Sequence, residues 1–112
     1  MQMKDVRFMG SSLDDIKKFP AGARRDTGFE LSNVQSGLYP SDWKPMSTVG
    51  SGVSEIRIKD EAGIYRVIYV AKFEDAVYVL HAFEKKTQKT RKADIALAKA
   101  RYKALAGERK RK

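Results

Sequence analysis

The sequence predicts one α+β domain in which helices pack on a small, mostly antiparallel sheet. Two runs, 64–71 and 76–83, are apolar on both faces except for one arginine and one histidine, and the preceding run 53–59 alternates. Runs that are apolar on both faces are typical of central strands covered from both sides. With 112 residues, 42% hydrophobic and 33% charged, the chain can bury one core and is too short for two. Residues 1–112 are therefore expected to form a single domain.

The first half predicts one strand and two helices. Residues 6–9 form a short strand candidate that ends at a glycine, and a short helix over 13–19 is stopped by Pro20. A second helix is expected over 21–38, because apolar residues recur there at spacings of 4, 4, 3 and 4. Two prolines predict that residues 39–46 are irregular.

The three strands of the second half predict an antiparallel meander. Their connections, residues 60–63 and 72–75, have the length of hairpin loops. His81 is placed on the face of Val77, Val79 and Phe83, where a lone histidine is expected to be a core residue with its own partner.

A final helix completes the order β-α-α-β-β-β-α. Thr90 is a candidate N-cap and Gly107 a candidate C′ residue, with a basic tail from about residue 107. Between them an apolar stripe recurs at spacings of 3, 4 and 3, formed by Ile95, Ala98, Tyr102 and Leu105.

Positive charge is concentrated in the last quarter of the chain. The net charge is +9, yet residues 85–112 alone carry twelve basic and two acidic residues, whereas residues 1–84 carry a net charge of −1. A segment of one sign attracts polyanions, and nucleic acid binds through such phosphate contacts. The alternative is a solvated tail that serves only solubility.

Several classes of site and location are excluded. The chain has no cysteine and one histidine, so neither a disulfide scaffold nor a thiolate or multi-histidine metal site is expected. It has no glycine-rich phosphate loop, and its acidic residues are scattered, with no pair that stands out as a set of metal carboxylates. No metal and no cofactor are therefore expected. No apolar run approaches the ~20 residues that span a bilayer, and the first residues lack the apolar core of a secretory signal. We expect no membrane association and a cytoplasmic location.

Five cations are predicted to converge at one end of the meander. Hairpin connections bring the end of the first strand, the start of the second and the residues after the third to the same edge. The cations at these positions are Arg57, Lys59, Arg66, Lys85 and Lys86.

Such a cluster is suited to phosphodiester chemistry. Arginines stabilise the extra charge of a pentacoordinate phosphate, and a lysine crowded by cations has a lowered pKa and can act as a base. RNA supplies its own nucleophile, the 2′-hydroxyl. Because a buried guanidinium needs a partner, the alternative role for Arg66 is a structural pair with Glu55 or Glu84.

Four short segments follow one another in the second part of the chain: 43–46 (WKPM), 52–57 (GVSEIR), 65–69 (YRVIY) and 80–90 (LHAFEKKTQKT). In this order they resemble the phage-derived branch of the HigB toxins, within the RelE/ParE superfamily. The resemblance extends from about residue 43 to 102. It implies a RelE-like fold and a type II toxin–antitoxin system. It also implies messenger-RNA cleavage in the ribosomal A site and neutralisation by a helix-turn-helix antitoxin of HigA type.

By position, the resemblance also implies which residues act. Arg66 matches the arginine that stabilises the scissile phosphate, Arg57 matches a basic position on the preceding strand, and Lys85 and Lys86 match the basic pair after the last strand. These four are the candidate catalytic residues. Residues expected to hold RNA are Lys44, Lys59, Lys89, Arg91 and Lys92.

Two other functions stay open. ParE proteins share the superfamily fold but inhibit DNA gyrase, and fold does not determine which activity a site performs. Residues 85–95 lack the tyrosine or histidine that RelE-like enzymes often carry there, which leaves a module that binds RNA or the ribosome without chemistry. Trp43, in the loop with two prolines, is a candidate either to pack an antitoxin or to stack a base.

Overall fold

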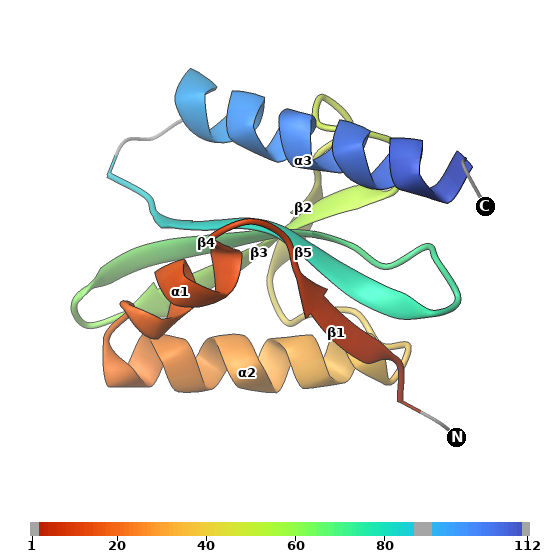
Figure 1. Cartoon of the computed structure of the whole chain (residues 1–112). Helices are drawn as coiled ribbons and strands as arrows, with labels where there is room; N and C mark the ends of the chain where they lie inside the picture. The colour runs from red at the N-terminus through yellow and green to blue at the C-terminus, as the bar shows by residue number, and fades with distance from the viewer. Residues whose placement is uncertain (1–2, 87–90, 111–112) are drawn as a thin grey trace.

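A five-stranded sheet lies between helices on both of its faces in the computed structural model, which describes residues 3–86 and 91–110 (Figure 1). One face carries the two N-terminal helices and the other carries the C-terminal helix. The elements are β1 (Asp5–Phe8), α1 (Ser12–Lys17), α2 (Ala21–Gln35), β2 (Trp43–Pro45), β3 (Val53–Asp60), β4 (Gly63–Val70), β5 (Ala76–Glu84) and α3 (Lys92–Lys110). No helix of the described segments has both the length and the apolar character needed to cross a membrane.

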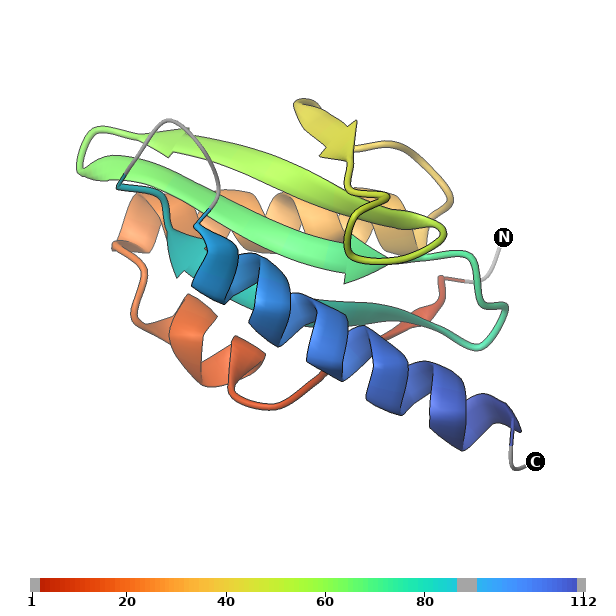
Figure 2. The same ribbon diagram turned by 90° about the horizontal axis from the view of Figure 1, so that it is seen from above.

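The strand order is β1-β5-β4-β3-β2. The predicted meander of β3, β4 and β5 is confirmed, since each pairs antiparallel with the next, while β1 lies parallel to β5 at one edge. Seen from the side of α3, that helix lies along β5 and leaves β3 and β2 free of helix (Figure 2).

The prediction that residues 39–46 are irregular is wrong at β2. This three-residue strand pairs antiparallel with β3, with Trp43 opposite Ile56 and Lys44 opposite Glu55. A proline lacks the backbone donor of a central strand, but Pro45 is tolerated as the last residue of an edge strand. The observed order is therefore β-α-α-β-β-β-β-α.

Helix α2 ends three residues before the predicted end at Leu38. Gly37 takes a left-handed conformation with φ of 87°. Its N–H donates to the carbonyl of Val34 at 3.0 Å, and the N–H of Leu38 donates to the carbonyl of Asn33 at 2.9 Å. This pair of bonds is a Schellman motif, which satisfies the last carbonyls and ends the helix.

Replacing Gly37 by alanine should destabilise the fold, whereas replacing Gly28 by alanine should stabilise it. Neither added Cβ would meet an atom within 4 Å, so only the backbone conformation differs. Alanine at the left-handed position costs about 1 kcal/mol, and alanine inside a helix contributes roughly 0.5–1 kcal/mol relative to glycine. Urea denaturation of both variants checks the opposite signs, and two shifts of one sign would contradict the assignment of the helix end.

Helix α3 continues past Gly107, so the prediction of Gly107 as the C′ residue is wrong. Gly107 is not among the glycines of positive φ, and the helix runs to Lys110. Arg109 explains the extension, because its guanidinium lies 3.1 Å from a carboxylate oxygen of Asp75 and 4.2 Å from the ring centre of Phe73. Residues 107–110 of the expected tail are thus helical, whereas the cap candidate Thr90 lies outside the described residues.

A β-bulge in β5 changes which face of the sheet the side chains of its second half point to. Ile68 pairs with His81, but the next residue, Tyr69, pairs with Val79. Leu80 is therefore the extra residue on β5. A single inserted residue shifts the alternation of side chains by one position.

His81 consequently faces α3 rather than the side of Val77 and Val79, which corrects its predicted placement. Val77 and Val79 belong to the core beneath α1 and α2, whereas Phe83, stacked on His81, belongs to the core beneath α3. His81 Nε2 lies 2.8 Å from Asp94 Oδ1, and both residues are buried. The prediction of a core histidine with its own partner is confirmed, and the pair ties the start of α3 to β5.

Candidate functional site

The predicted cations meet on the α3 side of the sheet, near the hairpin that joins β3 to β4. Arg57 and Arg66 stand directly opposite each other in the antiparallel register. Directly opposed residues point to the same face of a sheet. The N–H of Lys85 donates to the carbonyl of Ile64 at 2.7 Å, which places the residue after β5 beside the start of β4. Figure 2 shows this end of β5 and the start of α3 near the β3–β4 hairpin.

A buried carboxylate lies at the centre of this group. Glu55 is fully buried on β3, with Oε1 at 3.4 Å from Arg66 Nε and 4.0 Å from Lys44 Nζ. Arg66 is itself only 5% exposed. Two charges of opposite sign can be buried together at far lower cost than either one alone. Of the alternatives that the sequence left open for Arg66, the structure shows the pair with Glu55.

The electrostatic environment changes the protonation of Lys85. Burial lowers the pKa of Lys85, and the charge of Arg66 lowers it further. Glu55 acts in the opposite direction, while Lys44 and Arg57 add smaller downward effects. Lys85 thus loses its proton at a lower pH than an ordinary lysine, as a general base requires.

Burial also lowers the pKa of Arg66, and the charge of Glu55 opposes this effect. The guanidinium of Arg66 and the carboxylate of Glu55 therefore influence each other and are best considered as a pair. Its net effect on a nearby ligand is smaller than that of a free guanidinium, because the charges of the pair largely offset each other.

Arg57 is the more accessible of the two arginines. Its side chain is 34% exposed, and a guanidinium nitrogen lies 3.9 Å from a carboxylate oxygen of Asp42. The loop that carries Asp42 is held in place by the buried Glu30, whose carboxylate accepts the N–H of Ser41 at 3.2 Å. A loose, exposed ion pair of this kind leaves donors of Arg57 available to an anionic ligand.

The structure brings together some of the predicted residues and separates others. Lys44, Arg57, Arg66 and Lys85 form one group around Glu55, which we call the cationic cluster. Lys59 and Lys86 are exposed at the ends of β3 and β5, and within residues 3–86 and 91–110 neither forms an ion pair.

The predicted RNA-holding residues near α3 have different surroundings. Arg91 Nε donates to Asp94 Oδ2 at 3.2 Å, so part of its charge is used within the fold. Lys92 is exposed at the first position of α3. Lys89 lies outside the described residues.

Sequence reasoning missed two acidic members of the site. It offered Glu55 only as an alternative partner of Arg66, and it did not consider Asp42. The signal for Glu55 was its place between Val53 and Arg57 on one face of a strand, where its side chain is buried. Asp42 directly precedes β2, which was not predicted from the sequence because of the two prolines. The position of Asp42 beside Arg57 could therefore not be inferred.

The cluster combines phosphate-binding cations with one lysine of lowered pKa. In residues 3–86 and 91–110, no three histidine, aspartate or glutamate side chains are grouped as metal ligands would be. The guanidinium groups of the cluster can bind phosphate oxygens, and its lysine of lowered pKa can accept a proton.

Comparison with known proteins places this geometry in a family. The profile of the family described as "Phage derived protein Gp49-like (DUF891)" matches residues 14–103. The structure of a mutant of the E. coli toxin RelE in the free state is similar, with a TM-score of 0.64 and 15% identity over 94% of this chain and 99% of that chain. No curated protein matches the sequence significantly.

The structural similarity confirms the predicted RelE-like α+β fold. It extends over nearly the whole of both chains, and the family match includes every strand of the cationic cluster. The chain belongs to the phage-derived Gp49-like family, which is of the RelE/HigB toxin type.

Proposed function

We propose that this protein is the toxin of a type II toxin–antitoxin system, of the HigB branch, and that it cleaves messenger RNA on the ribosome. The observation that carries the proposal is the cationic cluster, in which Arg57 stands opposite Arg66 and next to a lysine of lowered pKa. Family membership and the RelE-like fold support the toxin assignment. Acting on ribosomes, the protein would work in the cytoplasm.

The proposed reaction uses the 2′-hydroxyl of RNA as nucleophile. Lys85, in its neutral form, takes the proton of the 2′-hydroxyl while the oxygen attacks the adjacent phosphorus. Arg57 binds the phosphate oxygens and stabilises the negative charge of the phosphorane. The bond from phosphorus to the 5′-oxygen then breaks, leaving a 2′,3′-cyclic phosphate and a 5′-hydroxyl. Protonated Lys86 supplies the proton for that 5′-oxygen.

In this scheme Arg66 does not contact the phosphate but acts through Glu55 and Lys85. Its guanidinium is buried against Glu55, and its charge is the largest electrostatic cause of the lowered pKa of Lys85 after burial. Other cations are proposed to bind RNA, through phosphate contacts that hold the strand over the site. They are Lys44, Lys59, Lys89, Arg91 and Lys92.

Neutralisation is proposed to come from a helix-turn-helix antitoxin of HigA type. Antitoxin binding need only cover the cationic cluster or block access to the ribosome to prevent cleavage. No metal and no cofactor enters the proposed reaction, because the RNA supplies the nucleophile and the protein supplies proton transfer and positive charge.

Incubation of the purified protein with a messenger RNA, with and without programmed ribosomes, tests the proposal. We expect discrete cuts within codons only when ribosomes are present, mapped by primer extension. Arg57→Gln should weaken the cuts, whereas Lys103→Gln, an exposed cation on α3 away from the cluster, should leave them unchanged.

Two outcomes would point to the other functions. Intact messenger RNA, together with inhibited DNA gyrase, would favour a ParE-like inhibitor. Ribosome binding without cleavage would favour the binding module.

A further inference from the structure

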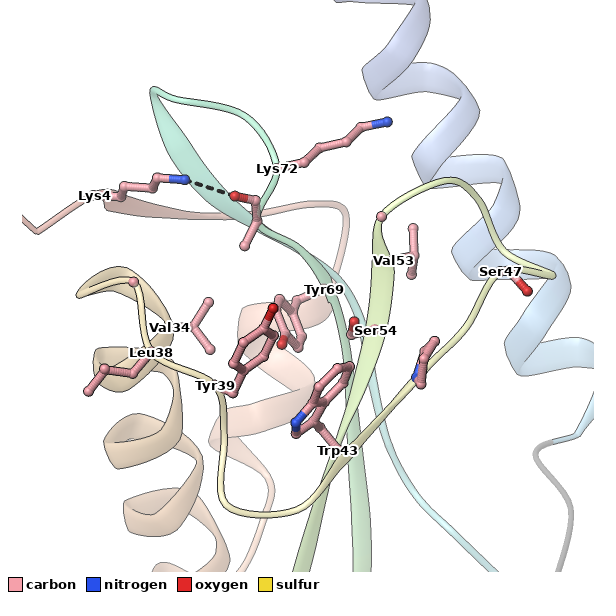
Figure 3. Close-up of a pocket in the computed structure, with 14 residues that line it drawn as sticks. Lys4, Val34, Leu38, Tyr39, Trp43, Ser47, Val53, Ser54, Tyr69 and Lys72 are labelled. Carbon is pink, nitrogen blue, oxygen red and sulfur yellow. Dashed lines mark hydrogen bonds between the residues drawn. The ribbon is translucent and has the colours of Figure 1, made fainter.

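A second candidate site lies beside β2, on the sheet face opposite the cationic cluster. It is a pocket of about 440 Å³ between β2, β3 and the end of α2 (Figure 3). Aromatic rings, a hydroxyl group and lysine side chains line it, from Tyr39, Trp43, Tyr69, Ser54, Lys4 and Lys72. Its composition differs from that of an ordinary apolar groove, since it joins flat rings to polar and positive groups.

Two of the rings form a stack at the mouth of the pocket. The centroids of Tyr39 and Trp43 are 4.9 Å apart, with an angle of 10° between the planes. Tyr39 is 73% exposed, so its ring extends the stack toward solvent (Figure 3). An exposed aromatic ring held parallel to another is a platform on which a planar base can stack.

Polar groups stand deeper in the same pocket. Burial raises the pKa of Tyr69, and a side-chain hydrogen bond with Ser54 opposes that effect. The two hydroxyls are thus close together behind the aromatic stack. Hydroxyl groups that both donate and accept suit the edge of an unpaired base, where donors and acceptors alternate.

The charge of the pocket favours an anion. Its lining contains two lysines and no acid. Lys4 Nζ donates to the carbonyls of Ala71 and Phe73, both at 2.8 Å, and no ion pair of Lys4 is found among residues 3–86 and 91–110. Lys72 Nζ instead donates to Tyr102 Oη of α3 at 3.0 Å and points away from the aromatic rings (Figure 3). A nucleotide, which carries a planar base and a phosphate, matches both the rings and the charge.

Strand β2 contributes one residue to the pocket and the next residue to the cationic cluster. Trp43 and Lys44 are consecutive in β2, and successive side chains of a strand point to opposite faces. Trp43 lines the pocket, whereas Lys44 lies 4.0 Å from Glu55 in the cluster. Because β2 is the edge strand, a flexible polymer can pass over it from one face to the other.

We infer that this pocket binds one unpaired base of a single-stranded RNA that crosses β2 from the cationic cluster. The inference rests on the proposed function in one respect, that RNA is the substrate. The stack of Tyr39 and Trp43 holds the base, Tyr69 and Ser54 contact its edge, and Lys4 attracts a neighbouring phosphate.

Trp43 is the only tryptophan in the chain, so its fluorescence reports on the pocket directly. The experiment is a titration of the purified full chain with a single-stranded RNA carrying 2′-O-methyl groups, which cannot be cleaved by 2′-hydroxyl attack. We expect quenching of the tryptophan signal. Tyr39→Ala should weaken RNA affinity about tenfold, because it removes the exposed ring on which the base stacks.

Matched variants separate stacking from other effects. Tyr39→Phe keeps the ring and should restore the affinity, whereas Phe29→Ala removes an exposed aromatic ring of α2 outside the pocket and should leave it unchanged. A duplex of the same sequence should not quench the signal, because its bases are not free to stack.

Two results would overturn the inference: RNA binds without quenching, or Tyr39→Ala binds as tightly as the parent protein. Quenching by a partner protein but not by RNA would overturn it too, since the pocket would then be a protein interface. The ribosome cleavage assay is scored separately. Quenching that depends on Tyr39, without any cleavage, would support base binding in the pocket and overturn the proposed function. Cleavage without quenching would support the proposed function and overturn base binding in the pocket.

Discussion

Replacement of Lys85 by methionine is expected to lower the cleavage rate on programmed ribosomes by a factor of about 10² to 10⁴. This range is typical for the loss of a positioned general base. The surroundings of Lys85 favour its neutral form, because burial and Arg66 both lower its pKa. The measurement is the single-turnover rate of messenger-RNA cleavage, with Lys103→Met as the control for loss of a lysine elsewhere.

The same residue should determine how the rate depends on pH. Only the neutral amine accepts a proton, so the rate should rise with pH and level off above the lowered pKa of Lys85. Lys44 lowers that pKa, and therefore Lys44→Met should raise it and move the rising limb to higher pH. Lys85→Arg keeps the charge but cannot serve as a base, so an active Lys85→Arg variant would show that the residue acts as a cation only.

The second large effect is expected on stability, at the buried pair of Glu55 and Arg66. Glu55→Gln keeps the size of the side chain but leaves the guanidinium of Arg66, 5% exposed, without its negative partner. Removing one member of a buried ion pair costs about 3–5 kcal/mol, and we expect a loss toward the lower end of that range. Urea denaturation measures it.

Asp42→Asn is the matched control, since it also converts a carboxylate to an amide beside an arginine of the cluster. The Asp42 side chain is 50% exposed and its distance to Arg57 is 3.9 Å, so the loss should be below about 1 kcal/mol. The double variant Glu55→Gln with Arg66→Met should recover part of the stability, because it removes the unpaired charge. Equal losses for Glu55→Gln and Asp42→Asn would mean that the buried pair does not stabilise the fold.

This result affects how variants of Arg66 are interpreted. Replacing Arg66 is expected to lower the stability of the fold. It should also raise the pKa of Lys85, because the charge of Arg66 lowers that pKa. Cleavage by Arg66→Ala should therefore be compared with its stability before any loss of rate is assigned to contact with the phosphate.

The meeting of Arg57, Arg66 and Lys85 could be predicted from the sequence, for a physical reason. Short connections leave an antiparallel meander little freedom, and the alternation of apolar and polar residues sets its register. The observed register places Arg57 opposite Arg66 and the residues after β5 beside the start of β4. These contacts depend on neighbours along the chain and on nothing more distant.

Two wrong predictions, the placement of His81 and the irregular structure at β2, concern features that the local sequence pattern does not show. The bulge at Leu80 turned His81 toward α3, where Asp94 and a stacked Phe83 hold it, and no local pattern marks that extra residue. Strand β2 forms because β3 offers it a free edge, although two prolines in the loop indicate irregular structure. The roles proposed for the site residues remain predictions that the experiments above must test.

The sequence by itself determined the α+β class, the three central strands and the separation of positive charge toward the C-terminus. It did so because periodicity, turn chemistry and charge are local properties of the chain. Only the tertiary structure decided that Glu55 would be buried among Lys44, Arg66 and Lys85, and that Tyr39 would stack on Trp43 beside an edge strand. Burial and pairing depend on which elements lie on top of one another, and that arrangement is a property of the whole fold.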